Sequence, residues 1–264
     1  MGVPAIADEI CARYLAAVDD RHPDLLVGLY VVGSIALDDF RPGASDIDVV
    51  CVTRRPVTVA DIAPVHAELG TASSRPFFDG VYVTADELAA PPATGAKGVA
   101  VIEGKPIGES RAERHAVTWL TLARHGIGRR GPSPSEAWIH VDVAAARAHS
   151  RANLVDYWQP WVAAHRSLVS RAGLHSLTVD ALVWSVLGVS RLHAMVAEGS
   201  ILSKSAAGEY ALRTFPQHRA IIEYAVAARH GERTLFAGGP LFRRRAMLRY
   251  LDDVIAAALA RPSA

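Results

Sequence analysis

The sequence has few cysteines and no surplus of charge of either sign. Its 264 residues include only two cysteines, Cys11 and Cys51, which excludes a framework of disulfides and a cysteine-ligated zinc site. The 28 basic residues nearly balance the 27 acidic ones. A general nucleic-acid-binding protein needs a basic surplus to neutralise phosphates, so this balance argues against that class.

Long apolar segments and targeting signals are also missing. No run of eighteen apolar residues is free of charge, so we expect no transmembrane helix. The N-terminus has neither a basic region nor a long apolar core, so we expect no secretory signal. These absences predict a soluble cytoplasmic protein, long enough for one large domain or two of roughly 100–150 residues.

Up to about residue 90 the pattern alternates between helix and strand. Apolar residues at helical spacing predict a first helix over residues 6–18. Short apolar runs rich in β-branched residues predict three strands, over residues 25–32, 47–53 and 81–84. The third follows the turn-prone pair Asp79-Gly80. We interpret the Pro- and Gly-rich passage at 88–110 as a linker or an active-site loop.

Beyond residue 110 the pattern is almost wholly helical. A broad apolar face predicts a helix over residues 180–197, and Pro240 opens a last helix that runs to about residue 259. We therefore expect an N-terminal α/β domain over residues 1–105 and a C-terminal helical domain over residues 106–264.

The most informative segment joins the first two predicted strands. Gly33 and Ser34 end the first strand, and Asp46 and Asp48 open the second. In an extended strand the two carboxylates point to the same face and repel each other unless a divalent cation lies between them. Oxygen ligands suit Mg²⁺, and a Gly-Ser turn with exposed N–H groups suits a triphosphate. An isolated Asp-x-Asp is more often a solvated strand edge, but two carboxylates inside an apolar strand favour a metal site.

Gly33-Ser34 followed by Asp46-Ile47-Asp48 resembles the signature of the polymerase-β-type nucleotidyltransferase superfamily. Within it, the chain looks most like the aminoglycoside adenylyltransferases that modify streptomycin and spectinomycin. Three further stretches look like that family, over residues 114–132, 188–212 and 216–231. The resemblance covers nearly the whole chain. It implies an α+β fold, in which a polymerase-β-like nucleotidyltransferase domain with a mixed sheet precedes an all-α helical bundle.

The resemblance also implies roles for the residues of this motif. Ser34 and Ser45, beside Gly33, would contact the triphosphate of ATP. Asp46 and Asp48 would bind two Mg²⁺ ions, which bridge the phosphates and activate the attacking hydroxyl.

Two basic residues of the helical half match residues that the family uses toward ATP. Lys204 matches a lysine that contacts ATP from the helical domain, and Arg191 matches an arginine on the preceding helix. A lysine in the first turn of a helix opposes the helix dipole, which favours a ligand role for Lys204 over that of a solvated surface residue.

The family takes the proton from the acceptor hydroxyl with a glutamate on the third strand. The matching residue is Asp79, whose side chain is one bond shorter and which can serve as base, as third metal ligand or as both. The alternative is a turn residue in an Asp-Gly pair. Glu87 is the next candidate for the base.

The acceptor site matches the family least. The tryptophan that stacks on the antibiotic should lie near residues 96–110, and none is present there. The family's acceptor-binding positions on the helix after residue 178 fall near Ala181 and Trp184, one step from Asp180. We therefore take Asp180 and Trp184 as candidate substrate residues.

Other aromatic and acidic residues allow two interpretations. Trp158 and Trp161 offer a surface for stacking a sugar, but packing in the core or between the domains is favoured. Asp142 and Asp156 would attract a cationic sugar, and a solvated helix face explains them equally well.

The resemblance implies a cytoplasmic, monomeric enzyme of antibiotic resistance that acts on small molecules, with neither nucleic acid nor membrane as partner. With Mg²⁺ it would transfer a nucleoside monophosphate, AMP from ATP, to a hydroxyl of an aminoglycoside-type antibiotic and release pyrophosphate. The alternatives are another hydroxylated metabolite as acceptor, a protein or tRNA acceptor as in toxin–antitoxin relatives, and a degenerate nucleotide-binding module without turnover. The charge balance and the long helical half disfavour a protein or tRNA acceptor. The presence of Ser34, Asp46 and Asp48 disfavours a degenerate module.

Overall fold

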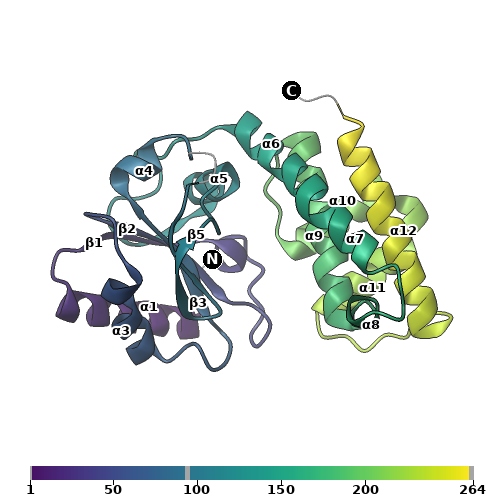
Figure 1. The fold of residues 1–264 in the computed structure, drawn as a ribbon, viewed down its shortest axis with the longest axis horizontal. Coiled ribbons are helices and arrows are strands. Elements are labelled where there is room, and N and C mark those ends of the chain that lie inside the picture. Colours follow the sequence, from purple (N-terminus) through teal and green to yellow (C-terminus); the bar gives the residue numbers. More distant parts are fainter. Residues whose placement is uncertain (1, 93–95, 262–264) are drawn as a thin grey trace. The chain divides into compact units, whose positions relative to one another are not determined.

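The chain folds into two compact units, Met1–Val143 and Ala144–Ala264. The computed structural model describes residues 2–92 and 96–261, and the ribbon in Figure 1 follows the chain through both units. The first unit combines a sheet with helices, and the second is helical. This confirms the expected α+β fold.

The described part of the first unit contains a six-stranded sheet with the strand order β5-β4-β3-β2-β1-β6. Its strands are β1 (Leu26–Val31), β2 (Ile47–Thr53), β3 (Phe78–Thr84), β4 (Gly98–Ile102), β5 (Lys105–Ser110) and β6 (Ile127–Arg130). β2 and β3 are parallel, and every other neighbouring pair is antiparallel. The sheet is therefore mixed, as the resemblance implied.

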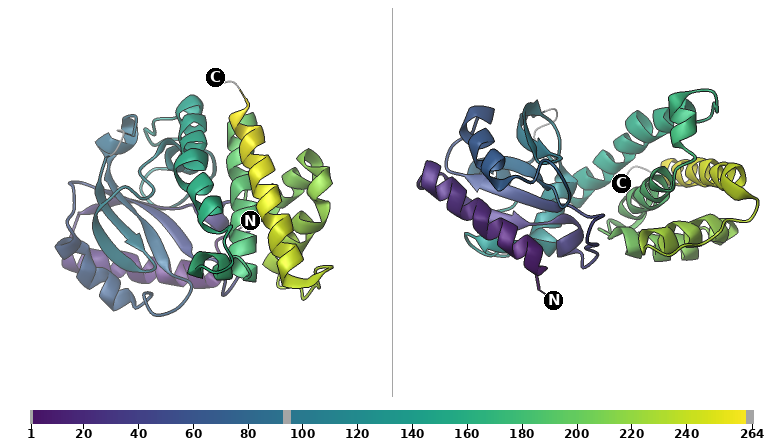
Figure 2. Two further views of the ribbon diagram at one scale, coloured as in Figure 1. Left: turned by 45° about the vertical axis from the view of Figure 1, so that its right-hand side comes forward. Right: turned by 90° about the horizontal axis from the view of Figure 1, so that it is seen from below.

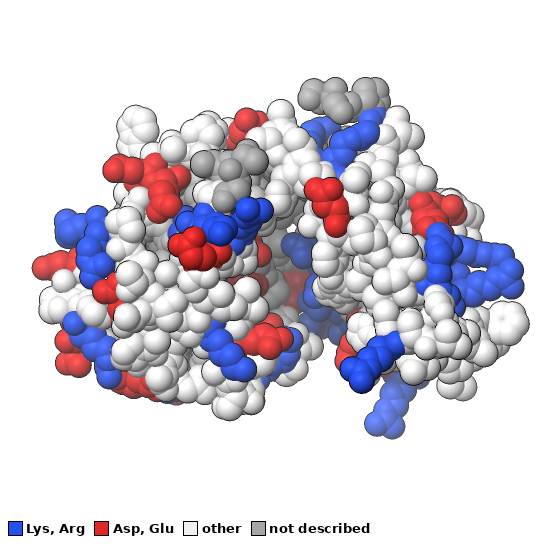
Figure 3. All heavy atoms as spheres, viewed as in Figure 1, with Lys and Arg blue, Asp and Glu red and all other residues white. Residues whose placement is uncertain are grey.

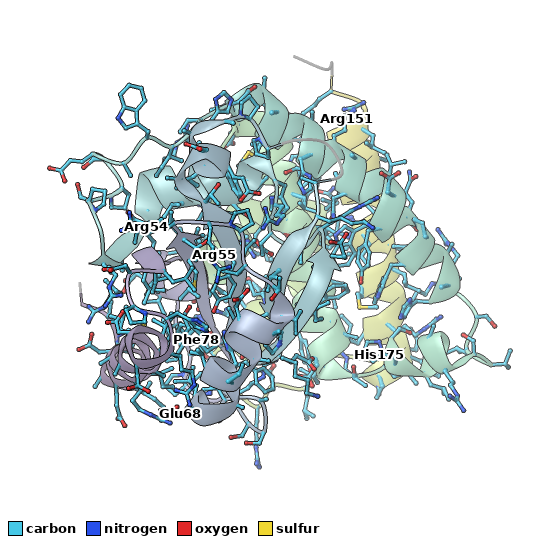
Figure 4. The ribbon with its side chains drawn as sticks, turned by 60° about the vertical axis from the view of Figure 1, so that its left-hand side comes forward. Arg54, Arg55, Glu68, Phe78, Arg151 and His175 are labelled. Atoms are coloured by element: carbon cyan, nitrogen blue, oxygen red, sulfur yellow. The ribbon has the colours of Figure 1, made fainter. Side chains whose placement is uncertain are left out.

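Helices cover both faces of this sheet. One face packs against α1 (Ala5–Arg21) and α3 (Val59–Leu69), and Figure 2 shows α1 lying along it. Phe78 lies in this core, with its ring centroid 4.8 Å from that of Tyr14 (Figure 4). The other face packs against α4 (Ala85–Ala89) and α5 (Ala116–His125). Acidic and basic side chains are interspersed over the surface of this unit that Figure 3 shows.

The second unit is built around one long apolar helix. Its helices are α6 (Val143–Asn153), the π-helix Leu154–Trp158, α7 (Gln159–Ala164), α8 (Arg171–His175), α9 (Val179–Glu198), α10 (Lys204–Thr214), the 3₁₀ turn Pro216–His218, α11 (Arg219–Arg229) and α12 (Gly239–Leu259). Helix α9 packs against α10, α11 and α12. By length and composition α9 is apolar enough to cross a membrane, but most of its apolar stretch is buried inside this unit. Its core position accounts for that composition.

The ends of α9 follow ordinary capping chemistry. The hydroxyl of Thr178 accepts a hydrogen bond from the N–H of Ala181 at 3.1 Å, and the helix ends at Gly199 with φ +69°. A hydroxyl satisfies a free N–H of the first turn, and glycine adopts the left-handed conformation at little cost. The helix predicted over residues 180–197 is therefore confirmed with one further residue at each end.

Two predictions about the first unit are wrong. Asp79 and Gly80 form no turn but lie inside β3, where the parallel neighbour β2 pairs with both of them. The passage at 88–110 is neither a linker nor an open loop along its length, because β4 and β5 form a hairpin that extends the sheet. Residues 93–95 of that passage lie outside the described residues.

The division between the units also lies later than expected. The boundary expected after residue 105 falls at the start of β5 and would divide the hairpin. The segment after residue 110 is not wholly helical, since β6 pairs with β1 and keeps α5 and β6 in the first unit. This pairing joins residues about a hundred positions apart in sequence, which local periodicity does not reveal.

Candidate active site

One edge of the sheet gathers the end of β1 and the starts of β2 and β3. The N–H of Val32, directly after β1, donates to the carbonyl oxygen of Asp48 at 2.8 Å. The short helix α2 (Gly33–Ala36) follows at once. The predicted Gly-Ser turn and the second aspartate are therefore neighbours across two strands.

Gly33 allows the carboxylate of Asp48 to lie directly against the backbone. Its φ is +62°, a conformation that residues with a Cβ rarely adopt. A Cβ built at this position would lie 2.0 Å from Oδ2 of Asp48. Only glycine therefore permits this turn and this carboxylate position together.

The two predicted serines differ in what their hydroxyls contact. The hydroxyl oxygen of Ser34 is buried and has no hydrogen-bond partner within the described residues. The hydroxyl of Ser45 accepts a hydrogen bond from the N–H of Arg41 at 3.0 Å and so closes the loop that leads into β2. Because a buried hydroxyl without a partner is costly, Ser34 is suited to a ligand that restores the hydrogen bond.

Asp46, immediately before β2, has contacts on both carboxylate oxygens. Its Oδ1 accepts from the N–H of Phe77 at 3.1 Å, and its Oδ2 forms an ion pair with the guanidinium of Arg75. The sequence analysis did not identify Arg75. No local pattern marks it, because the contact joins segments about thirty residues apart.

Asp79 lies opposite Asp48 in the parallel pairing of β2 with β3. Its Oδ1 accepts from the N–H of Gly104 at 2.7 Å, and its Oδ2 accepts from the N–H of Glu103 at 3.0 Å. The carboxylate thus holds the turn between β4 and β5. The turn brings the backbone of Glu103 to the same edge of the sheet. The sequence analysis did not identify Glu103 as part of the site.

Burial raises the pKa of Asp79 above the usual range of an aspartate. The two N–H groups of the turn act in the opposite direction, the negative charge of Asp46 adds to the increase, and the positive charge of Arg75 reduces it. A carboxylate with a raised pKa is a better proton acceptor than a carboxylate with the ordinary pKa.

Asp46, Asp48 and Asp79 are the carboxylates at this edge that the sequence predicts as magnesium ligands. Within residues 2–92 and 96–261, no three His, Cys, Asp or Glu side chains are grouped as metal ligands. The expected third ligand, Asp79, has both oxygens on the turn. Mg²⁺ is commonly held by one or two carboxylates together with substrate phosphates. The carboxylate oxygens of Asp46 and Asp48 suit that arrangement, and the buried hydroxyl of Ser34 has no partner within the described residues.

Glu87 is poorly placed to be the base. It follows β3 and therefore lies at the opposite end of that strand from Asp79. Its carboxylate accepts from the N–H of Thr84 at 2.8 Å in a capping box and from Nη1 of Arg114 at 2.6 Å. These contacts give Glu87 a structural role.

In the second unit, the two basic candidates meet at the start of α10. Nε of Arg191 on α9 donates to the carbonyl oxygen of Leu202 at 2.9 Å. Ser203 caps α10 by accepting from the N–H of Ala206 at 3.2 Å, and Lys204 is the first residue of that helix. The structure thus places Arg191 beside the segment that leads into α10, where Lys204 is the first helical residue.

Asp180 and Trp184 lie one turn apart on α9, and both are exposed. The ring centroid of Trp184 lies 4.4 Å from that of Trp158 and 5.8 Å from that of Tyr157. Trp158 is buried in the core of this unit, which confirms the packing role expected for it. Tyr157 and Trp184 remain 45% and 37% exposed, and with the half-buried Trp161 they form what we call the aromatic patch.

Comparisons with known proteins match part of each unit to a protein family. Residues 11–87 match the nucleotidyltransferase domain family, and this range contains the Gly-Ser turn and all three aspartates. Residues 163–238 match the C-terminal domain of the aminoglycoside adenylyltransferases. The chain is a nucleotidyltransferase of the aminoglycoside adenylyltransferase type.

A solved structure supports the fold of this nucleotidyltransferase along its length. It is the crystal structure of the spectinomycin adenyltransferase AAD(9) from Enterococcus faecialis with ATP and spectinomycin. The similarity has a TM-score of 0.67 at 14% sequence identity and covers 93% of this chain and 99% of that chain. At this identity the match concerns the fold. Among curated proteins, none matches the sequence significantly.

The contact between Gly33 and Asp48 gives a direct test of the carboxylate edge. Gly33→Ala should lower the rate of nucleotidyl transfer by about 100-fold, because the new methyl group displaces the Asp48 carboxylate by more than an ångström. The measurement is kcat/KM for nucleotidyl transfer, together with the melting temperature.

Gly43→Ala is the matched control for this substitution. Gly43 also has a positive φ, +76°, but a Cβ there would meet no atom within 4 Å. It should therefore lose stability through the same backbone strain and keep its activity. Equal loss of activity in both variants would show that strain, and not the position of Asp48, matters.

Proposed function

We propose that this chain is a cytoplasmic, monomeric enzyme that transfers AMP from ATP to a hydroxyl of an aminoglycoside-type antibiotic and releases pyrophosphate. The observation that carries the proposal is the pair Asp46 and Asp48 beside the Gly33-Ser34 turn at one sheet edge. The two cysteines are buried and unpaired, as suits a reducing compartment. Antibiotic resistance is the biological role that this reaction would serve.

The residues of the first unit would bind the magnesium complex of ATP. When bound, two Mg²⁺ ions supply the positive charge that neutralises the phosphates and favours ionisation of the acceptor hydroxyl. Asp46 and Asp48 would hold these ions, and the hydroxyl of Ser34 would donate to a phosphate oxygen, which satisfies its buried oxygen. Ser45 would contribute through its own hydroxyl hydrogen, since its oxygen accepts from Arg41.

Asp79 would take the proton of the acceptor hydroxyl. Each of its oxygens accepts one hydrogen bond, and a carboxylate oxygen has capacity for two. The proton can therefore arrive while the turn between β4 and β5 stays bound. The burial that raises the pKa of Asp79 makes it a stronger base than an exposed aspartate.

Arg191 and Lys204 would contribute positive charge to the triphosphate. Their proximity at the start of α10 supports a shared anionic ligand. A lysine in the first turn of a helix is otherwise unfavourable, and an anion bound there offsets that cost.

The acceptor would contact the aromatic patch. The exposed faces of Trp184 and Tyr157 suit the apolar face of a sugar ring and its ammonium groups. Exposed carboxylates at Asp156 and Asp180 lie on the same two helical segments and attract a polycation. The C-terminal domain match supports an aminoglycoside, and AAD(9) was solved with spectinomycin.

The test is release of pyrophosphate from ATP and Mg²⁺ with a panel of aminoglycosides. We expect acceptor-dependent release, and mass spectrometry should detect the product with one added AMP. Asp48→Asn should lower the rate by roughly 1,000-fold through loss of a metal ligand. Asp20→Asn, at a carboxylate that is 84% exposed on α1, should leave the rate unchanged.

Other outcomes would contradict parts of the proposal. One such outcome is that the enzyme modifies no aminoglycoside and instead transfers to tRNA, to a protein or to another hydroxylated metabolite. That result would contradict the proposed acceptor and leave the proposed nucleotidyl transfer standing. Asp48→Asn at the wild-type rate would contradict the metal site. Binding of ATP with no turnover on any acceptor would indicate a nucleotide-binding module.

The role of Asp79 predicts a pH profile. The base must be deprotonated, so kcat/KM should rise as the pH increases through a pKa above that of an ordinary aspartate. Asp79→Asn should remove this limb and lower turnover by about 10²–10⁴-fold, with a small effect on ATP binding. The melting temperature of the variant shows whether loss of the hydrogen bonds between Asp79 and the β4–β5 turn destabilises the fold. Asp79→Ala turning over at more than about a tenth of the wild-type rate would assign the proton to another group.

The aromatic patch predicts a change in KM for the acceptor. Trp184→Ala should raise that KM by about fivefold to tenfold, leave the KM for ATP unchanged and be partly rescued by Trp184→Phe. Trp138→Ala is the control, because Trp138 lies in the first unit and is 88% exposed. Equal acceptor KM values for Trp184→Ala and the wild type would show that the aromatic patch does not bind the acceptor.

A further inference from the structure

Arg75 contacts the carboxylate of Asp46, the first of the two predicted metal ligands. Its guanidinium pairs with Oδ2 of Asp46, and the same Nη1 donates to the carbonyl oxygen of Ala44 at 3.3 Å. Its Cζ lies 5.1 Å from the ring centroid of Phe77, whose N–H donates to the other oxygen of Asp46. Both oxygens of Asp46 are therefore occupied by groups of the protein itself.

A guanidinium and a divalent cation disfavour each other on the same carboxylate oxygen. The oxygen has lone pairs for two partners, but the two positive charges repel each other at this distance. Arg75 neutralises Asp46 as long as no metal is bound, which limits the repulsion among the carboxylates of this edge. Binding of a metal at Asp46 is therefore more favourable once Arg75 has left that oxygen.

Arg75 is partly exposed to solvent. Its side chain is 40% exposed, and it lies in an irregular segment between α3 and β3. Its ion pair is with Asp46. A displaced arginine seeks another anion, and its planar fork binds phosphate oxygens well. A metal–nucleotide complex brings both the displacing cation and a new anionic partner.

We propose that Arg75 exchanges partners, pairing with Asp46 in the metal-free enzyme and with the triphosphate once the metal–nucleotide complex is bound. The proposal rests on the proposed function for the nature of that complex. As a consequence, metal alone binds weakly, nucleotide and metal bind cooperatively, and Arg75 is a triphosphate-binding residue of the first unit.

The experiment compares two affinities in the same variants. Binding of Mn²⁺ alone is followed by electron paramagnetic resonance, and binding of the non-cleavable analogue α,β-methylene-ATP with Mn²⁺ by calorimetry. Arg75→Ala should bind Mn²⁺ alone about threefold to tenfold more tightly, because the competing cation is gone. It should bind the Mn²⁺–nucleotide about tenfold more weakly, because a phosphate contact is lost. Arg75→Lys, which keeps the charge without the fork, should lie between the wild type and Arg75→Ala.

Arg55→Ala is the matched control. Arg55, labelled in Figure 4, pairs with Asp61 at 2.9 Å and is 55% exposed, so its environment resembles that of Arg75 away from the carboxylate edge. Both affinities should stay within about twofold of the wild type, as for loss of any exposed ion pair.

Each remaining outcome overturns the proposal or one half of it. Unchanged or weaker binding of Mn²⁺ alone in Arg75→Ala overturns the competition. Unchanged nucleotide affinity overturns the transfer to the triphosphate. Failure of the proposed function is distinguishable, because the wild type would then release no pyrophosphate with any acceptor while the two affinities can still be compared. A wild type that binds neither probe overturns both proposals.

Discussion

The parallel pairing of β2 with β3 is the constraint on which the candidate active site depends. It sets Asp48 opposite Asp79 at the edge where β1 ends in the Gly-Ser turn. In a parallel pair the starts of both strands meet at one edge, so carboxylates at those starts gather without any loop to position them. The negative charge so gathered is compensated by groups that the fold supplies, namely the guanidinium of Arg75 and the N–H groups of the β4–β5 turn.

The fold was predictable wherever local pattern and tertiary structure agree. β2 is an apolar, β-branched run and has the bounds that its sequence predicts, and α9 differs by one residue at each end. The β4–β5 hairpin and β6 were missed. The residues of β5 and β6 are polar or include Gly and Pro, and they become strands because neighbouring strands offer backbone partners. β4 is an apolar run, but it lies in a passage whose Pro and Gly residues favoured a loop. Pairing with β2 makes Asp79-Gly80, a predicted turn, part of a strand.

The site was predictable to the extent that its residues are close in sequence. Gly33, Ser34, Asp46 and Asp48 come from two strand ends joined by one loop, and the structure sets them side by side. Arg75 and the turn at Glu103 come from distant segments and carry no motif. Their contacts follow from strand order, which a single sequence leaves open. The roles of these residues toward metal and nucleotide remain predictions.

The most direct measurement of the central claim is a crystal structure of this chain with Mn²⁺ and α,β-methylene-ATP, in which anomalous scattering locates the metal. The account predicts a Mn²⁺ peak about 2.1 Å from oxygens of Asp46 and Asp48, with phosphate oxygens completing its coordination. It also predicts that Arg75 no longer contacts Asp46. A structure with nucleotide bound, no Mn²⁺ at these two carboxylates and the Arg75–Asp46 ion pair intact would contradict it.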